Sequence, residues 1–437
     1  MKIALVTSLQ DAAGMNIRDN IRQLLDENWG AEVPGRTYTF HDVPGRLIHA
    51  EHMDTGLDAD LVIFLSRHSS VNPVPVLTVH VTGNYGEAEL GGAPRTLPPA
   101  APGIMQAILR ALARHCPEGY RVSYEVTHHG PTDLSRPSFF VEIGSTEKEW
   151  NDPAAGRAVA MSVLFCVPQD PVPLIGIGGT HYAPRETEIA LSSRGAFGHI
   201  AGSRRQVAAL DRELVQEMIR QSGAVAAYID RKAVPRPDLE RLEAILESLE
   251  IPRLSESEIA SLGHLPWETY AAVRKMAGAV SPGARCYIHA LAGPGTPVLL
   301  RANPVLLAET ARTDEPGLLK KLDDLPVIHL STHDNRLLPE FITFDEHSSE
   351  IINALNTLCV KIIRSREITA TENDYLIITK VRFDPKKARE LGISPGPSYR
   401  ELVGGRTVVI DGRTITPDMV SSRSEIRVQI PGLEKYS

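Results

Sequence analysis

Histidines in short polar loops are the residues of this chain best suited to chemistry. They are His68, His80, His128, His129 and His181. Each lies at or just after the end of an apolar, β-type run and is followed by glycine, proline or hydroxyl-bearing residues. Imidazole transfers protons or binds metal ions near neutral pH, and the strand ends of an α/β sheet can deliver side chains to one cleft. We therefore expect one site, and its predicted catalytic residues are His80, His128, His129 and His181.

The adjacent pair His128-His129 allows two interpretations. Neighbouring residues of a strand point to opposite faces, so only one imidazole can face a cleft while the strand continues. Gly130-Pro131 follows directly, and this dipeptide favours a sharp turn that ends the strand. From the pair alone, two interpretations remain open. Both histidines could be functional, or one could be structural and the other exposed.

A metal site is permitted by the same inventory of side chains. Imidazole nitrogens and carboxylate oxygens make catalytic zinc sites that keep one position open, and Glu125 and Glu142 lie close to the histidine loops. No two histidines have the helical H-x-x-x-H spacing, so spacing alone does not establish zinc. The predicted metal ligands are His128, His129, His181 and Glu142.

Polar residues beside the histidines are candidates for binding a substrate. Arg67 stands between serine and His68, and a guanidinium next to hydroxyls can hold a phosphate or a carboxylate. Gly178-Gly179 follows a strand but lacks the G-x-G-x-x-G spacing of dinucleotide sites, so we expect close backbone approach to a ligand instead. The predicted substrate-binding residues are Arg67, His68, Asn84, Gly178 and Gly179.

Strands and helices that alternate along the first part of the chain must position these residues. We predict strands at 3–7, 61–65, 76–81, 121–126, 139–143, 173–177 and 224–229, and helices at 16–29, 104–115, 153–165, 204–221 and 237–249. Continuous apolar strands separated by amphipathic helices indicate an α/β sheet with helices on both faces. The pattern runs to about Glu250, so residues 1–250 are the predicted catalytic domain.

Residues 251–437 are predicted to form a second, smaller α+β domain. Pro252 and the helix-start signature at Ser255 mark the boundary. Predicted strands at 286–290, 297–300, 327–330 and 375–381 and a helix at 350–363 follow.

Composition limits the classes of protein. A formal charge of −8 argues against a general electrostatic nucleic-acid binder, although local basic patches remain possible. The four cysteines are far apart, which excludes a zinc ribbon and fits a reducing compartment. The sequence shows no signal peptide and no run of roughly 18 apolar residues. We expect a soluble, cytoplasmic protein, free of membranes and monomeric.

Six motifs, in order along the chain, resemble those of the archaeal- and plant-type D-aminoacyl-tRNA deacylases. They lie at 66–70, 78–84, 127–132, 137–145, 176–184 and 196–200. The resemblance covers roughly residues 1–250. It implies a phosphorylase/hydrolase-like mixed sheet, zinc dependence, tRNA as the partner, and hydrolysis of the ester between a D-amino acid and the tRNA 3′ end.

The remainder of the chain extends beyond the shorter members of that family. Residues 383–417 resemble the C-terminal segment of tRNase Z, which implies tRNA handling, with fold stabilisation as an equal alternative. Two other functions stay open. One is a hydrolase of another nucleotide-linked substrate such as peptidyl-tRNA, and the other is a non-catalytic tRNA-binding protein.

Overall fold

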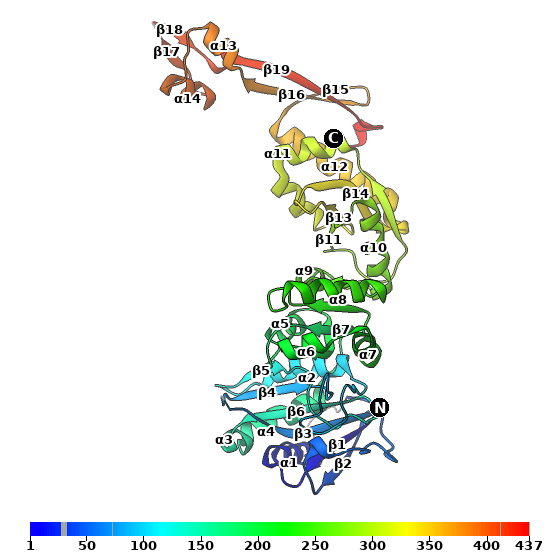
Figure 1. Ribbon diagram of the computed structural model, residues 1–437. Coiled ribbons are helices and arrows are strands. Elements are labelled where there is room, and N and C mark those ends of the chain that lie inside the picture. The colour runs from blue at the N-terminus through cyan, green and yellow to red at the C-terminus, as the bar shows by residue number, and fades with distance from the viewer. Residues whose placement is uncertain (28–32, 72, 411, 437) are drawn as a thin grey trace. The chain divides into compact units, whose positions relative to one another are not determined.

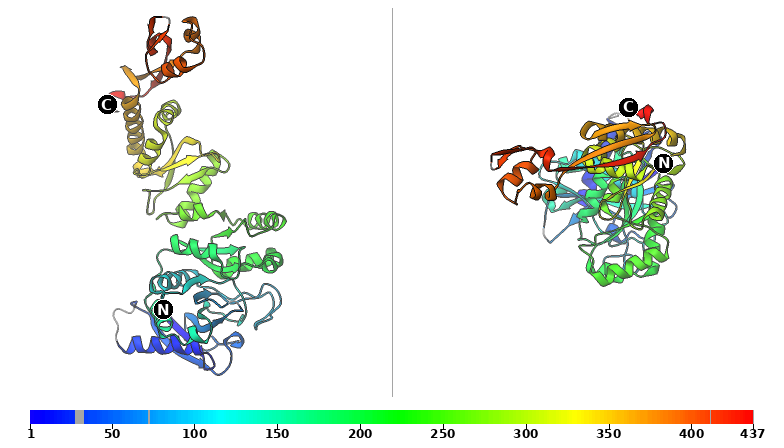
Figure 2. Two further views of the ribbon diagram at one scale, coloured as in Figure 1. Left: turned by 90° about the vertical axis from the view of Figure 1, so that its left-hand side faces the viewer. Right: turned by 90° about the horizontal axis from the view of Figure 1, so that it is seen from above.

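The chain forms two compact units, Met1–Leu262 and Gly263–Ser437. The computed structural model describes residues 1–27, 33–71, 73–410 and 412–436, whose course can be followed in Figures 1 and 2. The division falls after Leu262, somewhat later than the predicted boundary at Glu250. In the described ranges no helix combines the length and the apolar character that a bilayer span needs.

A six-stranded mixed sheet forms the base of the first unit. Its strands, in the order β2-β1-β3-β6-β4-β5, are β2 (Thr37–Val43), β1 (Lys2–Ser8), β3 (Leu61–Ser69), β6 (Ser138–Ser145), β4 (Val76–His80) and β5 (Arg121–Tyr124). All neighbours are parallel except β4 and β6, which are antiparallel. β4 and β5 therefore run against the other four strands, and the carboxyl ends of β3 and β4 do not meet at one edge.

The two faces of this sheet are covered differently. Helices that pack on one face are α1 (Ala12–Asp26), α2 (Pro102–His115) and α4 (Pro153–Phe165). On the other face, Val62, Phe64 and Phe140 pack against Leu47, Ala59 and Leu134 from loops and a single 3-10 turn. The prediction of helices on both faces is therefore wrong for this sheet, because apolar side chains of the loop at 47–59 cover the strands instead.

A second, four-stranded sheet completes the unit. Its order is β10-β9-β7-β8, all parallel, with β10 (Arg253–Leu254), β9 (Ala226–Ile229), β7 (Val172–Ile177) and β8 (Gly195–Ala201). α7 (Arg212–Ser222) and α8 (Arg236–Ser248) pack on one face, and α5 (Pro184–Ser192) packs on the other. Helix α2 lies between the two sheets and contacts both (Figure 1). Helices cover both faces here, as predicted.

Some predicted boundaries need correction. The predicted helix at 204–221 is two helices, α6 (Arg204–Ala209) and α7, because Leu210 is extended and the Asp211 side chain caps α7 by accepting from the Leu214 amide. The helix predicted at 16–29 corresponds to α1, which begins earlier, at Ala12. Residues 28 and 29 of the prediction lie outside the described ranges. Short helices α3 (Glu147–Trp150) and α9 (Glu256–Ala260) complete the unit.

The second unit is built from antiparallel strands and separate helices. Its sheets are β11 (Arg285–Tyr287), β13 (Ile328–Ser331), β14 (Leu337–Phe344) and β12 (Pro297–Arg301); β15 (Ile368–Glu372), β16 (Tyr375–Phe383) and β19 (Ser421–Gln429); and β17 (Val408–Ile410) with β18 (Arg413–Ile415). Its helices are α10 (Trp267–Val280), α11 (Pro304–Leu322), α12 (Ser348–Arg366), α13 (Pro385–Glu390) and α14 (Pro397–Val403). Leu306, Phe341 and Leu355 lie at the centre of its main core.

Candidate functional site

Three functional side chains share the loop-covered face of the six-stranded sheet. Glu142 on β6 pairs with Ser66 on β3 and, on its other side, with Thr78 on β4. His68 and His80 each lie two residues beyond those partners, and side chains two residues apart share a face. The antiparallel β4 therefore brings His80 to the same surface as His68, and the histidines meet on a face rather than at a common carboxyl edge.

Directly after β5, the chain crosses to the edge of the second sheet and hydrogen-bonds to it before returning to β6. The Val126 amide donates to the His181 carbonyl at 2.9 Å, and the Thr127 amide donates to the Ile200 carbonyl at 2.9 Å. This crossing places Glu125 and His128 beside His181, which follows β7. The site thus lies at the seam of the two sheets.

Glu125 is the carboxylate at the centre of this seam. It is fully buried, and its oxygens lie 2.8 Å from His181 Nε2, 3.1 Å from His68 Nδ1 and 3.6 Å from His128 Nε2. Burial opposes its charge, but the contacts with His181 and His68 prevail and hold the pKa of Glu125 well below its usual range. Glu125 is therefore an ionised carboxylate surrounded by imidazoles.

His68 carries the compensating positive charge. Burial disfavours this charge, but the contacts with Glu125 and Glu142 outweigh it and raise the pKa of His68 to about 11. Its Nε2 lies 3.0 Å from the Tyr182 hydroxyl. Burial, together with the charge of Glu125, raises the pKa of Glu142 to about 7 against the opposing contact with His68. The two carboxyl groups therefore differ in role, because only Glu125 is firmly ionised.

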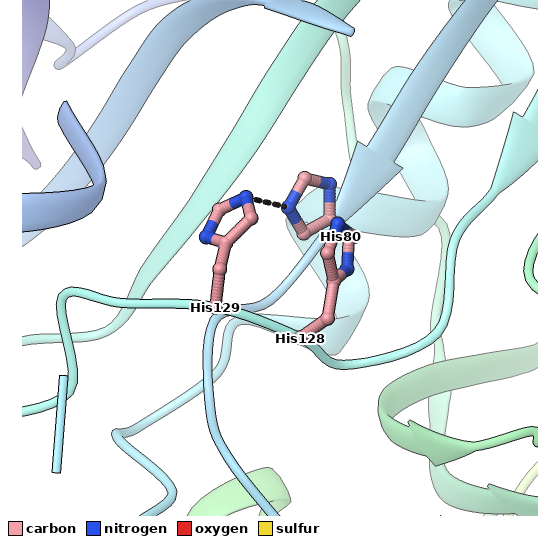
Figure 3. A group of neighbouring side chains, drawn as sticks. All are labelled: His80, His128 and His129. Atoms are coloured by element: carbon pink, nitrogen blue, oxygen red, sulfur yellow. Dashed lines mark hydrogen bonds between the residues drawn. The ribbon is translucent and has the colours of Figure 1, made fainter. Parts of the chain in front are cut away.

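His80, His128 and His129 form a neutral group beside this pair (Figure 3). The His80 and His129 Nε2 atoms are 3.2 Å apart, and the His80 and His128 rings stack with centroids 4.3 Å apart. Burial is the first cause that lowers the pKa of each imidazole, to about 3 for His129. Neutral imidazoles can accept a proton or bind a cation.

Backbone carbonyls fix the tautomers of the adjacent pair. His128 Nδ1 donates to the Val126 carbonyl and His129 Nδ1 donates to the Gly130 carbonyl, each at 2.7 Å. Both Nε2 lone pairs are consequently directed away from the backbone. β5 has ended at Tyr124, and His129 has a left-handed φ of 46°, so the strand alternation no longer applies and both rings line the same cleft.

These donors fit a metal ion. A carbonyl bound to Nδ1 is the usual outer partner of a metal-binding imidazole. His128 Nε2 faces the Glu125 carboxylate, so two acceptors meet without a proton between them. The buried His80 Nδ1 and both Glu125 oxygens form no hydrogen bond of normal geometry with the described residues. Each of these features indicates that a positive charge belongs between the side chains.

The predicted ligand set does not form one group, however. The triads whose ligand atoms lie within 4.8 Å of one another are His80–His128–His129, His68–Glu125–His181 and His80–Glu125–Glu142. Glu142 is thus grouped with His80 and Glu125, not with His128, His129 and His181. The sequence interpretation underrated Glu125, whose signal was its position just past β5 and three residues before His128.

Two pockets open onto the pair His128-His129. The first has a volume of about 270 Å³ and includes Arg46, Arg67, His68 and His181 in its lining. The second has a volume of about 240 Å³ and is lined by residues of the 83–90 and 203–209 segments. Both pockets are lined by Leu90, His128 and His129. The histidine pair therefore stands at the junction of a two-part cleft.

The predicted substrate-binding residues divide between this cleft and other places. Arg67 and His68 line the first pocket, with the Arg67 guanidinium 5.1 Å from the Trp150 ring centroid. Asn84 lines the second pocket, but its side-chain amide donates to the Gly91 and Ala93 carbonyls and so also holds a turn.

Gly178 and Gly179 are not where the sequence interpretation expected them. The Gly178 amide already donates to the Ala201 carbonyl at 2.8 Å, so it is not free for a substrate. Neither glycine lines the two pockets. Both have positive φ; Gly178 lies beside Val234 and Asp230, and Gly179 lies near Glu186. His199, which lies in the motif at 196–200, is buried between the Thr127 hydroxyl and the Pro98 carbonyl and is structural.

The fold and the site together define an α/β protein whose cleft is equipped for acid–base or metal-assisted chemistry. A family model described as D-aminoacyl-tRNA deacylase matches residues 55–254, a range that contains all five clustered histidines and both carboxylates. The D-aminoacyl-tRNA deacylase of Methanoregula boonei is 68% identical over 437 residues and that of Methanoculleus marisnigri is 53% identical over 439, with 100% of each chain covered. The chain belongs to the D-aminoacyl-tRNA deacylase family.

Shorter relatives match only part of the chain. The D-aminoacyl-tRNA deacylase of Methanosarcina mazei is 39% identical over 285 residues, which is 59% of this chain and 93% of that relative. A crystal structure of a conserved protein of unknown function has 32% identity and a TM-score of 0.54, and the match covers 60% of this chain and 96% of the other. These shares are close to that of the first unit, which holds 262 of the 437 residues.

Proposed function

We propose that this chain hydrolyses the ester bond of D-aminoacyl-tRNA and releases a free D-amino acid and tRNA. The observation that carries the proposal is the buried Glu125 among imidazoles at the junction of an open cleft, in a chain of this family. An aminoacyl ester is already reactive, so a positioned water and stabilisation of the developing oxyanion suffice for hydrolysis.

The side chains divide the work according to their charge. His181, whose Nε2 contacts Glu125 at 2.8 Å, accepts the proton of a water held at His128 and His129. Glu125 holds His181 at 2.8 Å and offsets the charge that develops on the imidazoles. His80, buried behind the pair, fixes His129 through the Nε2 contact. His181 is partly exposed, with 44% of its side chain accessible, so it can reach the leaving 3′ oxygen.

We propose zinc as the cofactor. His80, His128 and His129 would hold it, since they are neutral imidazoles grouped within ligand distance of one another. When bound, the ion supplies Lewis-acid polarisation and lowers the pKa of a water.

The substrate proposal extends to the rest of the molecule. tRNA is the proposed macromolecular partner, and Arg67 with His68 is the proposed contact for the terminal nucleotide. Residues 251–437 are proposed to assist tRNA handling, and the first unit to have a phosphorylase/hydrolase-like fold, which its mixed six-stranded sheet supports. A cytoplasmic location and a monomeric state complete this proposal.

Deacylation of D- and L-tyrosyl-tRNA by the purified protein tests the function. We expect rapid release of D-tyrosine and slow release of L-tyrosine. Equal rates for both forms, or no turnover of the D form, would overturn the proposal. Turnover of N-blocked aminoacyl-tRNA alone would indicate a peptidyl-tRNA hydrolase, and tight tRNA binding without turnover would indicate a binding protein.

A further inference from the structure

The two pockets that meet at His128-His129 differ in charge. In the first pocket, the guanidinium groups of Arg46 and Arg67 form no ion pair with any described residue. Two acids line it: Asp11 is already engaged, because it accepts from the Gly14 amide, the Ser66 hydroxyl and the Arg67 amide, and Glu142 lies 3.7 Å from the charged His68. Hydroxyl groups of Ser8, Ser66 and Ser69 complete a lining suited to an anion and a sugar.

The second pocket has the opposite character. It contains the carboxylates of Glu87 and Glu89 and one guanidinium, that of Arg205. Arg205 pairs with Glu89 at 2.7 Å. Within the described ranges no cation lies at ion-pair distance from Glu87, so the pocket retains one uncompensated negative charge.

The wall of the second pocket also holds a polar group without a firm partner. Tyr85 is 2% exposed, and its hydroxyl lies beside Thr127 without forming a hydrogen bond of normal geometry. A buried hydroxyl in this condition favours a ligand or a water that can complete its hydrogen bonding.

The substrate of the proposed reaction has the same division of charge. On one side of the ester stands the 3′ adenosine with its phosphates, which are anionic. On the other side stands the aminoacyl group, whose α-ammonium is cationic. With the ester carbonyl at the histidine pair, each half of the substrate must enter a different pocket.

We propose that the second pocket receives the D-aminoacyl group, with Glu87 binding its α-ammonium, and that the first pocket receives the 3′ adenosine, with Arg46 and Arg67 on its phosphate. The inference rests on the proposed function and assigns an orientation and a specificity residue to it. It also explains discrimination between mirror forms. With the ester fixed at His128-His129 and the ammonium at Glu87, inversion at Cα leaves the side chain directed at the pocket wall.

The experiment compares two esters that differ only at the α-position. D-phenylalanyl-tRNA carries an ammonium there, and D-phenyllactyl-tRNA carries a hydroxyl of similar size. Each rate is corrected for uncatalysed hydrolysis. The wild-type protein, Glu87→Gln and the control Glu118→Gln are measured; Glu118 is an exposed acid outside both pockets.

Glu87→Gln is expected to lower kcat/KM for D-phenylalanyl-tRNA about tenfold, the loss typical of one hydrogen bond to a charged group. It should leave the rate on D-phenyllactyl-tRNA unchanged, while Glu118→Gln changes neither. Arg46→Gln should raise KM for both esters alike, because it contacts the tRNA half.

The possible results distinguish a failure of the proposed orientation from a failure of the proposed function. No hydrolysis of D-phenylalanyl-tRNA by the wild type removes the proposed function itself. Hydrolysis by the wild type with an unaltered rate in Glu87→Gln, or with equal losses on both esters, overturns the orientation alone. An effect of Arg46→Gln confined to the ammonium ester would reverse the two pockets.

Discussion

Each unit of this molecule contains a group of stacked imidazoles, and the two groups differ in their carboxylates. In the second unit, His329 on β13 stacks on Tyr287 with ring centroids 4.6 Å apart, and His289 lies 6.2 Å from His329. The acid beside this group is Asp323, 3.0 Å from His289, and both of their side chains are more than 40% exposed. In the first unit, the central acid is Glu125, fully buried among three imidazoles, with Glu142 beside it.

The difference shows that a cluster of histidines alone does not produce a site for acid–base chemistry. Burial lowers the pKa of His329 to about 4, and the solvent-exposed Asp323 does too little to oppose it. In the first unit, the buried Glu125 keeps His68 charged while His80, His128 and His129 stay neutral. A buried carboxylate thus divides similar imidazoles into charged and neutral members, which acid–base chemistry requires.

Glu125→Gln should produce the largest effect. Removing one partner of a buried ion pair leaves His68 without its counter-charge, at a cost of about 3 kcal/mol in the free energy of unfolding. Deacylation should fall by at least about 1000-fold. The corresponding change in the second unit, Asp323→Asn, should alter neither quantity. Near wild-type deacylation by Glu125→Gln would show that the buried carboxylate is dispensable and would remove the comparison.

His128→Ala and His129→Ala should each lower kcat by about 100-fold or more, because the attacking water loses an imidazole that positions it. His289→Ala, in the second group, is the matched control and should retain full activity. Steady-state deacylation of D-tyrosyl-tRNA measures all three. Unchanged kcat in both His128→Ala and His129→Ala would exclude the pair from the reaction.

Metal content should separate the two groups as well. The wild-type protein and His289→Ala should bind zinc, whereas His128→Ala should not. Chelation should lower the melting temperature of the first unit, because a ligand that binds only the folded state at 100 times its Kd contributes about 2.7 kcal/mol. Elemental analysis and calorimetry check this, and zinc retained by His128→Ala would contradict the proposed ligands.

His329→Phe should give the smallest effect, confined to acid stability. The pKa of His329 is about 4 in the folded state, below the ordinary histidine pKa of about 6.5 that applies in the unfolded chain. Between pH 6.5 and 4 the unfolded chain therefore binds a proton that the folded chain does not, and stability falls as the pH falls. The phenylalanine variant lacks this loss and should be more stable by about 2 kcal/mol at pH 4. Deacylation should not change. The same substitution at the exposed His333, His333→Phe, serves as the control. Identical melting temperatures of the two variants at pH 4 would contradict the buried position of His329.

The sequence predicted that the five histidines lie close together, but it did not predict that Glu125 lies at their centre. Glu125 owes its role to the crossing between the sheets, where Thr127 bonds to Ile200 across more than seventy residues of sequence. No local pattern encodes such a contact. Gly178 was misassigned for a similar reason, since its amide serves a pairing with Ala201 that only the assembled sheet reveals.

Strands with continuous apolar runs, such as β3 and β7, were the predictable part of the fold, whereas the buried but glycine- and histidine-containing β8 was missed. Other strands were missed, among them the edge strands β2 and β19. β2 and β19 alternate polar and weakly apolar residues, and most of β19 is exposed, so both resemble loops in sequence. Helix α11 was missed because Pro316 and the non-helical Asp314 interrupt it.

The contact between the two sheets has a consequence for folding during synthesis. The last imidazole of the candidate site, His181, lies between β7 and β8 in the sequence, but the hydrogen bond from Thr127 to Ile200 requires β8. A nascent chain therefore contains every imidazole of the site before β8, which orients them, has been synthesised. Contacts of such long sequence separation close late in folding, so activity should emerge abruptly during synthesis, when β8 docks beside β7.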